Sequence, residues 1–231
     1  CQSTICCGFA FSWYGCSLCI SSDGNVYSFG KKSKGALGHV ENEIFPPKII
    51  PSLQNIYSIV HGKSHTMCLD YDGNVYTFGS NDSGQLGIPL DSIFSWRRLL
   101  NLGVPVEPWN DFTHKPQKIT IPPVKQISCT DLLNICVTEN SEVYSFGGQY
   151  NNRYVLPKKI ESLENVDFVE CGGDFVICKT KMNDVYVWGN NYKGQLGIGN
   201  RISQQFPYKC INWPDDIVDI KCGKYHTLLL T

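Results

Sequence analysis

The chain has 231 residues, of which 42% are hydrophobic and 18% are charged, so it can bury a substantial core and is too apolar for a disordered chain. Twenty basic residues nearly balance twenty-one acidic residues, and the formal net charge is -1. No stretch is rich in lysine or arginine, so the sequence carries no signal for direct binding to nucleic acid or to a membrane surface.

The first twenty residues, CQSTICCGFAFSWYGCSLCI, carry no charge and resemble a signal peptide at first sight. They lack a basic n-region and a cleavage pattern of small residues, and serines and glycines dilute their apolar character, so we predict soluble strands here. Twelve cysteines are too few for a small disulfide scaffold, which favours a reduced, intracellular protein, cytoplasmic or nuclear. The start at Cys1 instead of methionine favours a fragment or a processed chain.

A Val-Tyr-x-Phe/Trp-Gly motif recurs four times along the chain. The copies are VYSFG at 26–30, VYTFG at 75–79, VYSFG at 143–147 and VYVWG at 185–189, and they end at Gly30, Gly79, Gly147 and Gly189. The spacing of about fifty residues is typical of the blades of a β-propeller.

Other short motifs keep a fixed place relative to this anchor motif. A turn signal precedes each anchor: Asp23-Gly24, Asp72-Gly73, Ser141-Glu142 and Asn183-Asp184. A GxLG segment follows three of the anchors, at 35–38, 84–87 and 194–197, and a proline-led strand follows all four. Short alternating strands between such turns predict four-stranded antiparallel units, and no helical stretches alternate with them, which excludes a parallel α/β sheet.

The repeat units divide the chain into one all-β domain, or a fragment of one, with four to five blades. The predicted units are 1–50, 51–122, 123–164, 165–215 and a partial unit at 216–231. The third unit lacks the GxLG segment. The partial unit has no anchor motif after HTLLLT, so we expect an unpaired strand edge. A segment outside this sequence, another chain or the strands near the amino terminus must cover that edge.

The combination of VYxFG or VYxWG, GQLG, PxxI and CGxxHTxxL resembles the regulator of chromosome condensation repeat family. The segment VYVWGNNYKGQLGIGN at 185–200 is a near-complete match to the family's signature. The resemblance covers essentially the whole chain and implies a β-propeller, which has seven blades in that family. The blades counted here are fewer than seven.

The cysteines fall into two columns of the repeat. Cys19, Cys68, Cys136 and Cys178 precede the anchor valines at a constant distance, and Cys129, Cys171 and Cys222 form the second column. Equivalent positions on successive blades are spread around a ring, so we interpret both columns as structural core residues and not as a metal site. The Cys16-x-x-Cys19 pair leaves a local thiol or metal site open as an alternative.

His65 and His226 share one column of the repeat, which the other units fill with Cys16, Leu133 and Phe175. A position that accepts leucine and phenylalanine is apolar, so we expect a hydrogen-bonded, inward-facing histidine with a structural role. No catalytic triad, phosphate loop or recurring pair of carboxylates is recognisable. We therefore expect no enzyme activity, no cofactor and no bound metal.

An insertion at 88–112 makes the second unit about twenty residues longer than the pattern requires. It contains the residue types that dominate protein interfaces, and the candidate partner-binding residues are Trp96, Arg97, Arg98, Trp109 and Phe112. Ser92 as a cap and Gly103 as a stop predict a helix between them. The alternative is a surface helix that folds back over the propeller, and both roles can hold together.

These observations leave three functions open. The first is a non-catalytic interaction or scaffold module that binds another protein through loops of one face and through the 88–112 insertion. The second is implied by the resemblance alone: a guanine-nucleotide exchange factor for a Ran-like small GTPase, the activity of the family's founding member. No motif of this sequence matches an exchange contact. The third is the regulatory propeller of a larger chain, such as a ubiquitin ligase.

Overall fold

A computed structural model describes residues 7–13, 15–31, 34–89, 112–148, 154–214 and 216–231. Blade 1 contains β1 (Cys7–Trp13), β2 (Cys16–Ser21), β3 (Val26–Lys31) and β4 (Glu43–Ile49). Blade 2 contains β5 (Ile56–His61), β6 (His65–Asp70), β7 (Val75–Ser80) and β8 (Phe112–Lys118). No helix in these ranges is long and apolar enough to cross a membrane.

The second half of the chain repeats the same arrangement. Blade 3 contains β9 (Val124–Cys129), β10 (Leu133–Thr138), β11 (Val143–Gly147) and β12 (Tyr154–Lys159). Blade 4 contains β13 (Val166–Cys171), β14 (Phe175–Thr180), β15 (Val185–Gly189) and β16 (Gln204–Lys209). A terminal hairpin contains β17 (Asp219–Cys222) and β18 (Thr227–Leu230).

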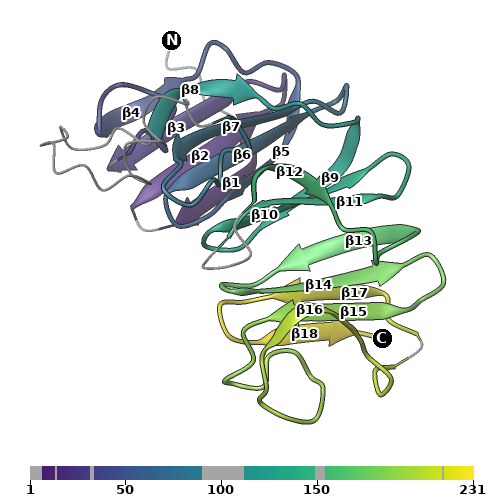
Figure 1. Cartoon of the computed structure of the whole chain (residues 1–231). Helices are drawn as coiled ribbons and strands as arrows, with labels where there is room; N and C mark the ends of the chain where they lie inside the picture. The colour runs from purple at the N-terminus through teal and green to yellow at the C-terminus, as the bar shows by residue number, and fades with distance from the viewer. Residues whose placement is uncertain (1–6, 14, 32–33, 90–111, 149–153, 215) are drawn as a thin grey trace, which may run out of the picture.

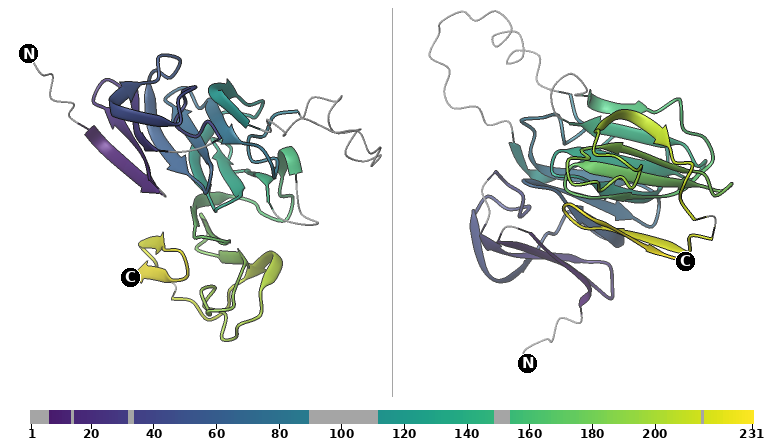
Figure 2. Two further views of the ribbon diagram at one scale, coloured as in Figure 1. Left: turned by 90° about the vertical axis from the view of Figure 1, so that its left-hand side faces the viewer. Right: turned by 90° about the horizontal axis from the view of Figure 1, so that it is seen from below.

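Each blade is a four-stranded antiparallel sheet in which neighbours in sequence are neighbours in space, and the terminal hairpin is a two-stranded sheet. The blades follow one another in chain order along an arc (Figures 1 and 2). The predicted all-β propeller, with four blades and part of a fifth, is confirmed. The first strand of each blade lies innermost, and the proline-led fourth strand lies outermost.

The hydrophobic core lies between the blades and not within any one of them. One buried cluster joins residues of blades 1 and 2, a second those of blades 2 and 3, a third those of blades 3 and 4, and a fourth blade 4 and the terminal hairpin. Phe78, Phe146 and Phe175 are the largest fully buried side chains. A single blade cannot bury its two faces alone, so the stability of each blade depends on its neighbours.

The tight turns between the second and third strands occur where the sequence predicted them. Gly24 and Gly73 have φ values of 75° and 80°, and Ser141 and Asn183 reach 63° and 64° without the freedom of glycine. The hydroxyl of Thr180 accepts a hydrogen bond from the backbone N–H of Asp184 and supports the Asn183 turn. Small polar residues therefore replace glycine here at a modest cost in backbone strain.

Side chains of the second strand fasten blades 2 and 3 and the terminal hairpin to the GxLG loop of the blade before each of them. The Thr66 hydroxyl donates to the Ala36 carbonyl at 3.0 Å, and the Asn134 amide donates to the Gln85 carbonyl at 2.7 Å. The Thr227 hydroxyl donates to the Gln195 carbonyl at 2.8 Å. Blade 4 has Val176 at this position, and it follows the one blade whose sequence lacks a GxLG loop. We call these contacts the loop latches.

The latch at Asn134 also holds His65. The Oδ1 atom of Asn134 lies 2.7 Å from Nε2 of His65, and both residues are fully buried. Because Nδ2 of Asn134 donates to Gln85, its Oδ1 accepts, and the imidazole carries its proton on Nε2. His65 is the inward-facing, hydrogen-bonded histidine that the sequence predicts.

This burial makes the fold sensitive to acid through His65. Desolvation lowers the pKa of His65 from 6.5 to about 4, although the hydrogen bond that His65 donates to Asn134 acts in the opposite direction. The unfolded chain therefore binds a proton between pH 6.5 and pH 4 that the folded chain does not. Stability present above pH 6.5 is lost as the pH falls through this window, by about 2 kcal/mol at pH 5.

Thermal or chemical unfolding from pH 7 to pH 4.5 measures this loss. We expect the pH dependence to flatten in His65→Phe, since phenylalanine already stands at this position of blade 4. Replacing the exposed His226 with phenylalanine is the matched control and should keep the dependence of the natural chain. An unchanged slope in His65→Phe would assign the acid sensitivity to other groups.

Candidate partner-binding face

The antiparallel strand order gathers two sets of loops at one end of the propeller. Each first strand ends, and each second strand begins, at the same end as the connection between the third and fourth strands. We call this end the loop face. It carries the inner loops 62–64, 130–132, 172–174 and 223–226, and the outer connections that contain the GxLG segments. The hairpin turns before each anchor motif lie at the opposite end, the turn face.

The two ends of the insertion leave blade 2 at the loop face. Pro89 is exposed, and Phe112 is half-buried at the first position of β8, opposite Ser80 of β7. Trp96, Arg97, Arg98 and Trp109 lie outside the described residues, as does the helix predicted between Ser92 and Gly103. The structure therefore places Phe112 within the blade, where its backbone pairs with β7.

A relay of main-chain hydrogen bonds joins the inner loops around the propeller axis. The N–H of Lys63 donates to the Asp131 carbonyl at 3.0 Å, and the N–H of Asp131 donates to the Gly173 carbonyl at 2.8 Å. The N–H of Gly173 donates to the Lys224 carbonyl at 3.3 Å. Consecutive blades are therefore bonded to each other at the centre of the loop face, as well as through the loop latches.

The second cysteine column converges on this centre. Cys129, Cys171 and Cys222 line one cavity of about 180 Å³ together with His61. We expected a column spread around a ring with each thiol buried in its own sheet. The structure differs because all first strands run close to the axis, so their ends approach one another. The three thiols are half-buried, in contrast to the fully buried Cys68, Cys136 and Cys178.

The thiols of this cavity are protonated at neutral pH. Burial raises the pKa of Cys129 to about 12, with a further contribution from Asp131. Burial also raises the pKa of Cys222 to about 12 and that of Cys171 well above its usual value. Among the described residues, no group of three or more His, Cys, Asp or Glu side chains could hold a metal ion. The three thiols are therefore neutral and not activated, in a cavity that Thr130, Asp131 and Lys224 also line.

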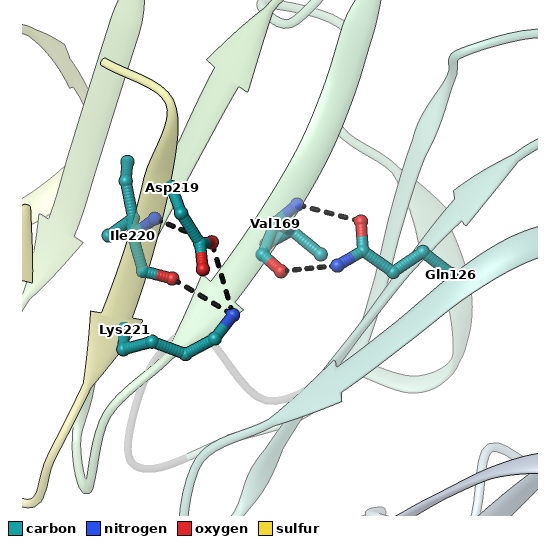
Figure 3. Close-up of polar contacts among 5 residues, drawn as sticks. All are labelled: Gln126, Val169, Asp219, Ile220 and Lys221. Carbon is teal, nitrogen blue, oxygen red and sulfur yellow. Dashed lines mark hydrogen bonds and ion pairs between the residues drawn. The ribbon is translucent and has the colours of Figure 1, made fainter. Parts of the chain in front are cut away.

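Polar side chains on the first strands make contacts between β9 and β13 and within β17 (Figure 3). The side-chain amide of Gln126 on β9 donates to the Val169 carbonyl on β13 at 2.8 Å and accepts from the Val169 N–H at 2.9 Å. It thus takes the place of a backbone unit in a strand pair. On β17, the Lys221 ammonium donates to the Asp219 carboxylate at 3.2 Å. Burial raises the pKa of Glu170, while nearby Lys221 acts in the opposite direction.

The four anchor glycines lie against the inner loops of their own blades. Gly30, Gly79, Gly147 and Gly189 have φ values of 105°, 110°, 83° and 104°. At each, a β-carbon would lie 2.3 to 2.5 Å from a carbonyl oxygen of the inner loop in the same blade. His226 is exposed, unlike His65, because the described residues place no further blade against it. His65 is therefore buried between two blades, and His226 lies on the last described element.

Sequence reasoning missed the contacts that join one blade to the next. These are the Gln126 contact to Val169, the latch at Asn134 and the main-chain relay of the inner loops. One signal was available for Asn134: it is a buried amide in a column that otherwise holds serine, threonine or valine.

Comparisons with known proteins show what the chain resembles. The model of the regulator of chromosome condensation (RCC1) repeat matches residues 23–69, 72–137 and 183–230. A second model of this repeat matches residues 56–85 and 166–195. The ultraviolet-B receptor UVR8 of Arabidopsis thaliana is 27% identical over 235 aligned positions, which cover 93% of this chain and 48% of UVR8.

Two solved structures share the fold. Human WBSCR16 superposes with a TM-score of 0.78 at 21% identity, over 97% of this chain and 57% of that one. Prp20p from Saccharomyces cerevisiae, described with its binding properties to Gsp1p and histones, superposes with a TM-score of 0.79 at 17% identity. That match covers 99% of this chain and 56% of Prp20p. The chain thus spans about half the length of these relatives.

Proposed function

Because the chain belongs to the regulator of chromosome condensation (RCC1) repeat family, we propose that it is a non-catalytic module that binds another protein through its loop face and the 88–112 insertion. One observation carries this proposal: Pro89 and Phe112, which flank residues 90–111, both lie at the loop face. The inner loops and the GxLG loops lie at this same end.

The chemistry of this surface favours a protein as the ligand. Trp96, Arg97, Arg98 and Trp109 are of the types that supply most of the binding energy at protein interfaces. The described loops of the loop face present charges of both signs, for example the ion pair between Lys34 and Asp82, which connects blades 1 and 2. A surface with mixed charge and inserted aromatic residues fits a folded partner better than an extended polyanion.

Alanine substitution tests the insertion directly. In Trp96→Ala/Arg97→Ala/Trp109→Ala, we expect capture of the partner to fall at least tenfold, because aromatic and arginine anchors at an interface each contribute on the order of 2 kcal/mol. The measurement is affinity capture with the tagged protein, followed by quantitative mass spectrometry. The melting temperature of the variant should be unchanged.

The matched control lies at the turn face. Tyr71 and Met182 are 75% and 79% exposed in hairpin turns, so Tyr71→Ala/Met182→Ala removes large exposed side chains from the opposite end. Capture should survive in this variant. If both variants lose the same partner equally, or if neither does, the insertion is not the binding surface.

Similarity to Prp20p favours a second candidate, guanine-nucleotide exchange on a small GTPase, since that structure is described with its binding to Gsp1p. The test is the release of a fluorescent GDP analogue from a panel of purified small GTPases, Ran included. Release accelerated at substoichiometric concentrations of this protein supports exchange activity. Binding of a GTPase without acceleration leaves the non-catalytic module as the function, and the triple alanine variant then tests whether the insertion makes that contact.

A further inference from the structure

We propose that His39 makes the contact between blade 1 and the root of the insertion sensitive to mild acid. The insertion root consists of residues 112–114, where the chain re-enters blade 2 as β8. Proton uptake by His39 loosens the GxLG loop at 35–38 from this root and thereby weakens partner binding. The inference rests on the proposed function, because it names a regulation of the same face. The residues involved belong to blades 1 and 2, whose strands are all described.

His39 occupies a position that the other blades fill with an apolar side chain. It directly follows the GxLG segment of blade 1, and the same position holds Ile88 in blade 2 and Ile198 in blade 4. Both isoleucines pack against the buried clusters between blades. His39 is only 9% exposed, so blade 1 buries an imidazole where the equivalent loops bury a hydrocarbon side chain.

The hydrogen bonds of His39 show which ring nitrogen carries the proton. The ring donates one hydrogen bond to the backbone of Lys48. Nε2 is buried and has no hydrogen-bond partner among the described residues, so the donor is Nδ1 and Nε2 carries the lone pair. A proton added at Nε2 would create a buried N–H group without an acceptor, which is costly in the folded state.

The groups around His39 together oppose its protonation. Burial lowers the pKa of His39 below its usual 6.5, and the positive charge of Lys48 lowers it further, as does His114 on β8. The hydrogen bond to Lys48 and the charge of Glu41 act in the opposite direction, but Glu41 already pairs with the Lys48 ammonium at 2.8 Å. An imidazole in water has its ordinary pKa, so acid favours arrangements in which His39 leaves its buried position.

The GxLG loop connects His39 to the insertion root. The N–H of Gly38 donates to the Gly35 carbonyl at 3.0 Å, so the segment forms one turn that ends beside His39. Gly35 lies directly against β8, because a β-carbon there would be 2.9 Å from the backbone nitrogen and the α-carbon of His114. β8 begins two residues before His114. A shift of this turn therefore removes a backbone contact that supports the insertion root.

Hydrogen exchange of the natural chain and of His39→Ile tests this coupling without a partner. Isoleucine stands at this position in blades 2 and 4, so the variant should fold, and it cannot take up a proton. We expect equal amide exchange in residues 34–38 and 112–118 at pH 7.5. At pH 5.5 these residues should exchange faster in the natural chain, by up to about tenfold for each pH unit below 6.5.

Two further variants serve as controls for the exchange experiment. His226→Phe removes an exposed histidine of the terminal hairpin and should behave like the natural chain. Lys48→Met removes a positive charge that disfavours the protonated His39, so it should reduce the acid-induced exchange while the histidine is still present. Equal exchange in the natural chain and in His39→Ile at both pH values would overturn the proposal.

Affinity capture at the same two pH values tests the consequence for binding. Capture by the natural chain should fall between pH 7.5 and pH 5.5, and capture by His39→Ile should fall less. Equal losses in the two proteins would overturn the regulatory role of His39. Failure of the proposed function is distinct, because capture would then survive the triple alanine substitution in the insertion while the exchange result stays the same.

Discussion

Replacing Gly79 with alanine should destabilise the protein by about 3 kcal/mol or more. Gly79 ends the anchor motif of blade 2 with a φ of 110°, in a region that residues with a β-carbon rarely adopt. An added β-carbon would lie 2.5 Å from the Ser64 carbonyl oxygen and 2.7 Å from the α-carbon of His65. Backbone atoms cannot move aside as a flexible side chain can, so blade 2 must distort where it holds His65.

Chemical denaturation measures this loss, and Gly194→Ala provides the matched control. Gly194 also has a positive φ, of 81°, but a β-carbon there would meet nothing within 4 Å. Its replacement therefore isolates the conformational strain, about 1 kcal/mol. If the two variants are equally stable, the close approach of the inner loop does not explain the anchor glycine.

The second large effect concerns the latch at Asn134, because Asn134→Leu should cost about 3 kcal/mol or more. The substitution removes two hydrogen bonds and leaves the Nε2–H of His65 and the carbonyl of Gln85 without their buried partner. Leucine has the same number and branching of side-chain heavy atoms as asparagine and is not smaller, so the substitution leaves no cavity and the loss includes the polar contacts.

The control for the latch is Thr227→Val at the equivalent position of the terminal hairpin. This variant loses one hydrogen bond at a half-buried site, so we expect a loss of about 1 kcal/mol. Chemical denaturation of each variant measures its loss in free energy of unfolding, and we expect the loss in Asn134→Leu to be the larger one. Equal losses would mean that the shared histidine contact adds nothing to the Asn134 latch.

Repetition explains why so much of the fold could be predicted. The anchor motif marks β3, β7, β11 and β15 because each copy meets a similar environment. A turn precedes it, an inner loop lies against its glycine and, in blades 2 to 4, a preceding blade lies against its aromatic ring. The residues before each anchor identified the turns for the same reason, including Ser141 and Asn183, which adopt positive φ. Each copy alone has only a weak preference for strands and turns, and the agreement of four copies makes the prediction of the fold firm.

The repeat pattern could not reveal how far each strand lies from the propeller axis. It also gives no information on a segment that has no second copy in the chain. The spacing of Cys129, Cys171 and Cys222 places them on successive blades but does not say that their strands lie innermost, where the thiols share one cavity. Likewise, His65 and His226 are equivalent in sequence and differ in burial, because burial depends on the neighbouring blade. The insertion at 88–112 has no second copy, so its candidate partner-binding residues stay a prediction.

Hydrogen exchange of the protein with its captured partner tests the central claim most directly. Binding at the loop face should slow exchange in peptides that cover 88–112 and the inner loops 62–64 and 130–132. Exchange at the turns 71–74, 139–142 and 181–184 on the opposite end should not change. Protection confined to those turns, or no protection within 88–112, would contradict the account.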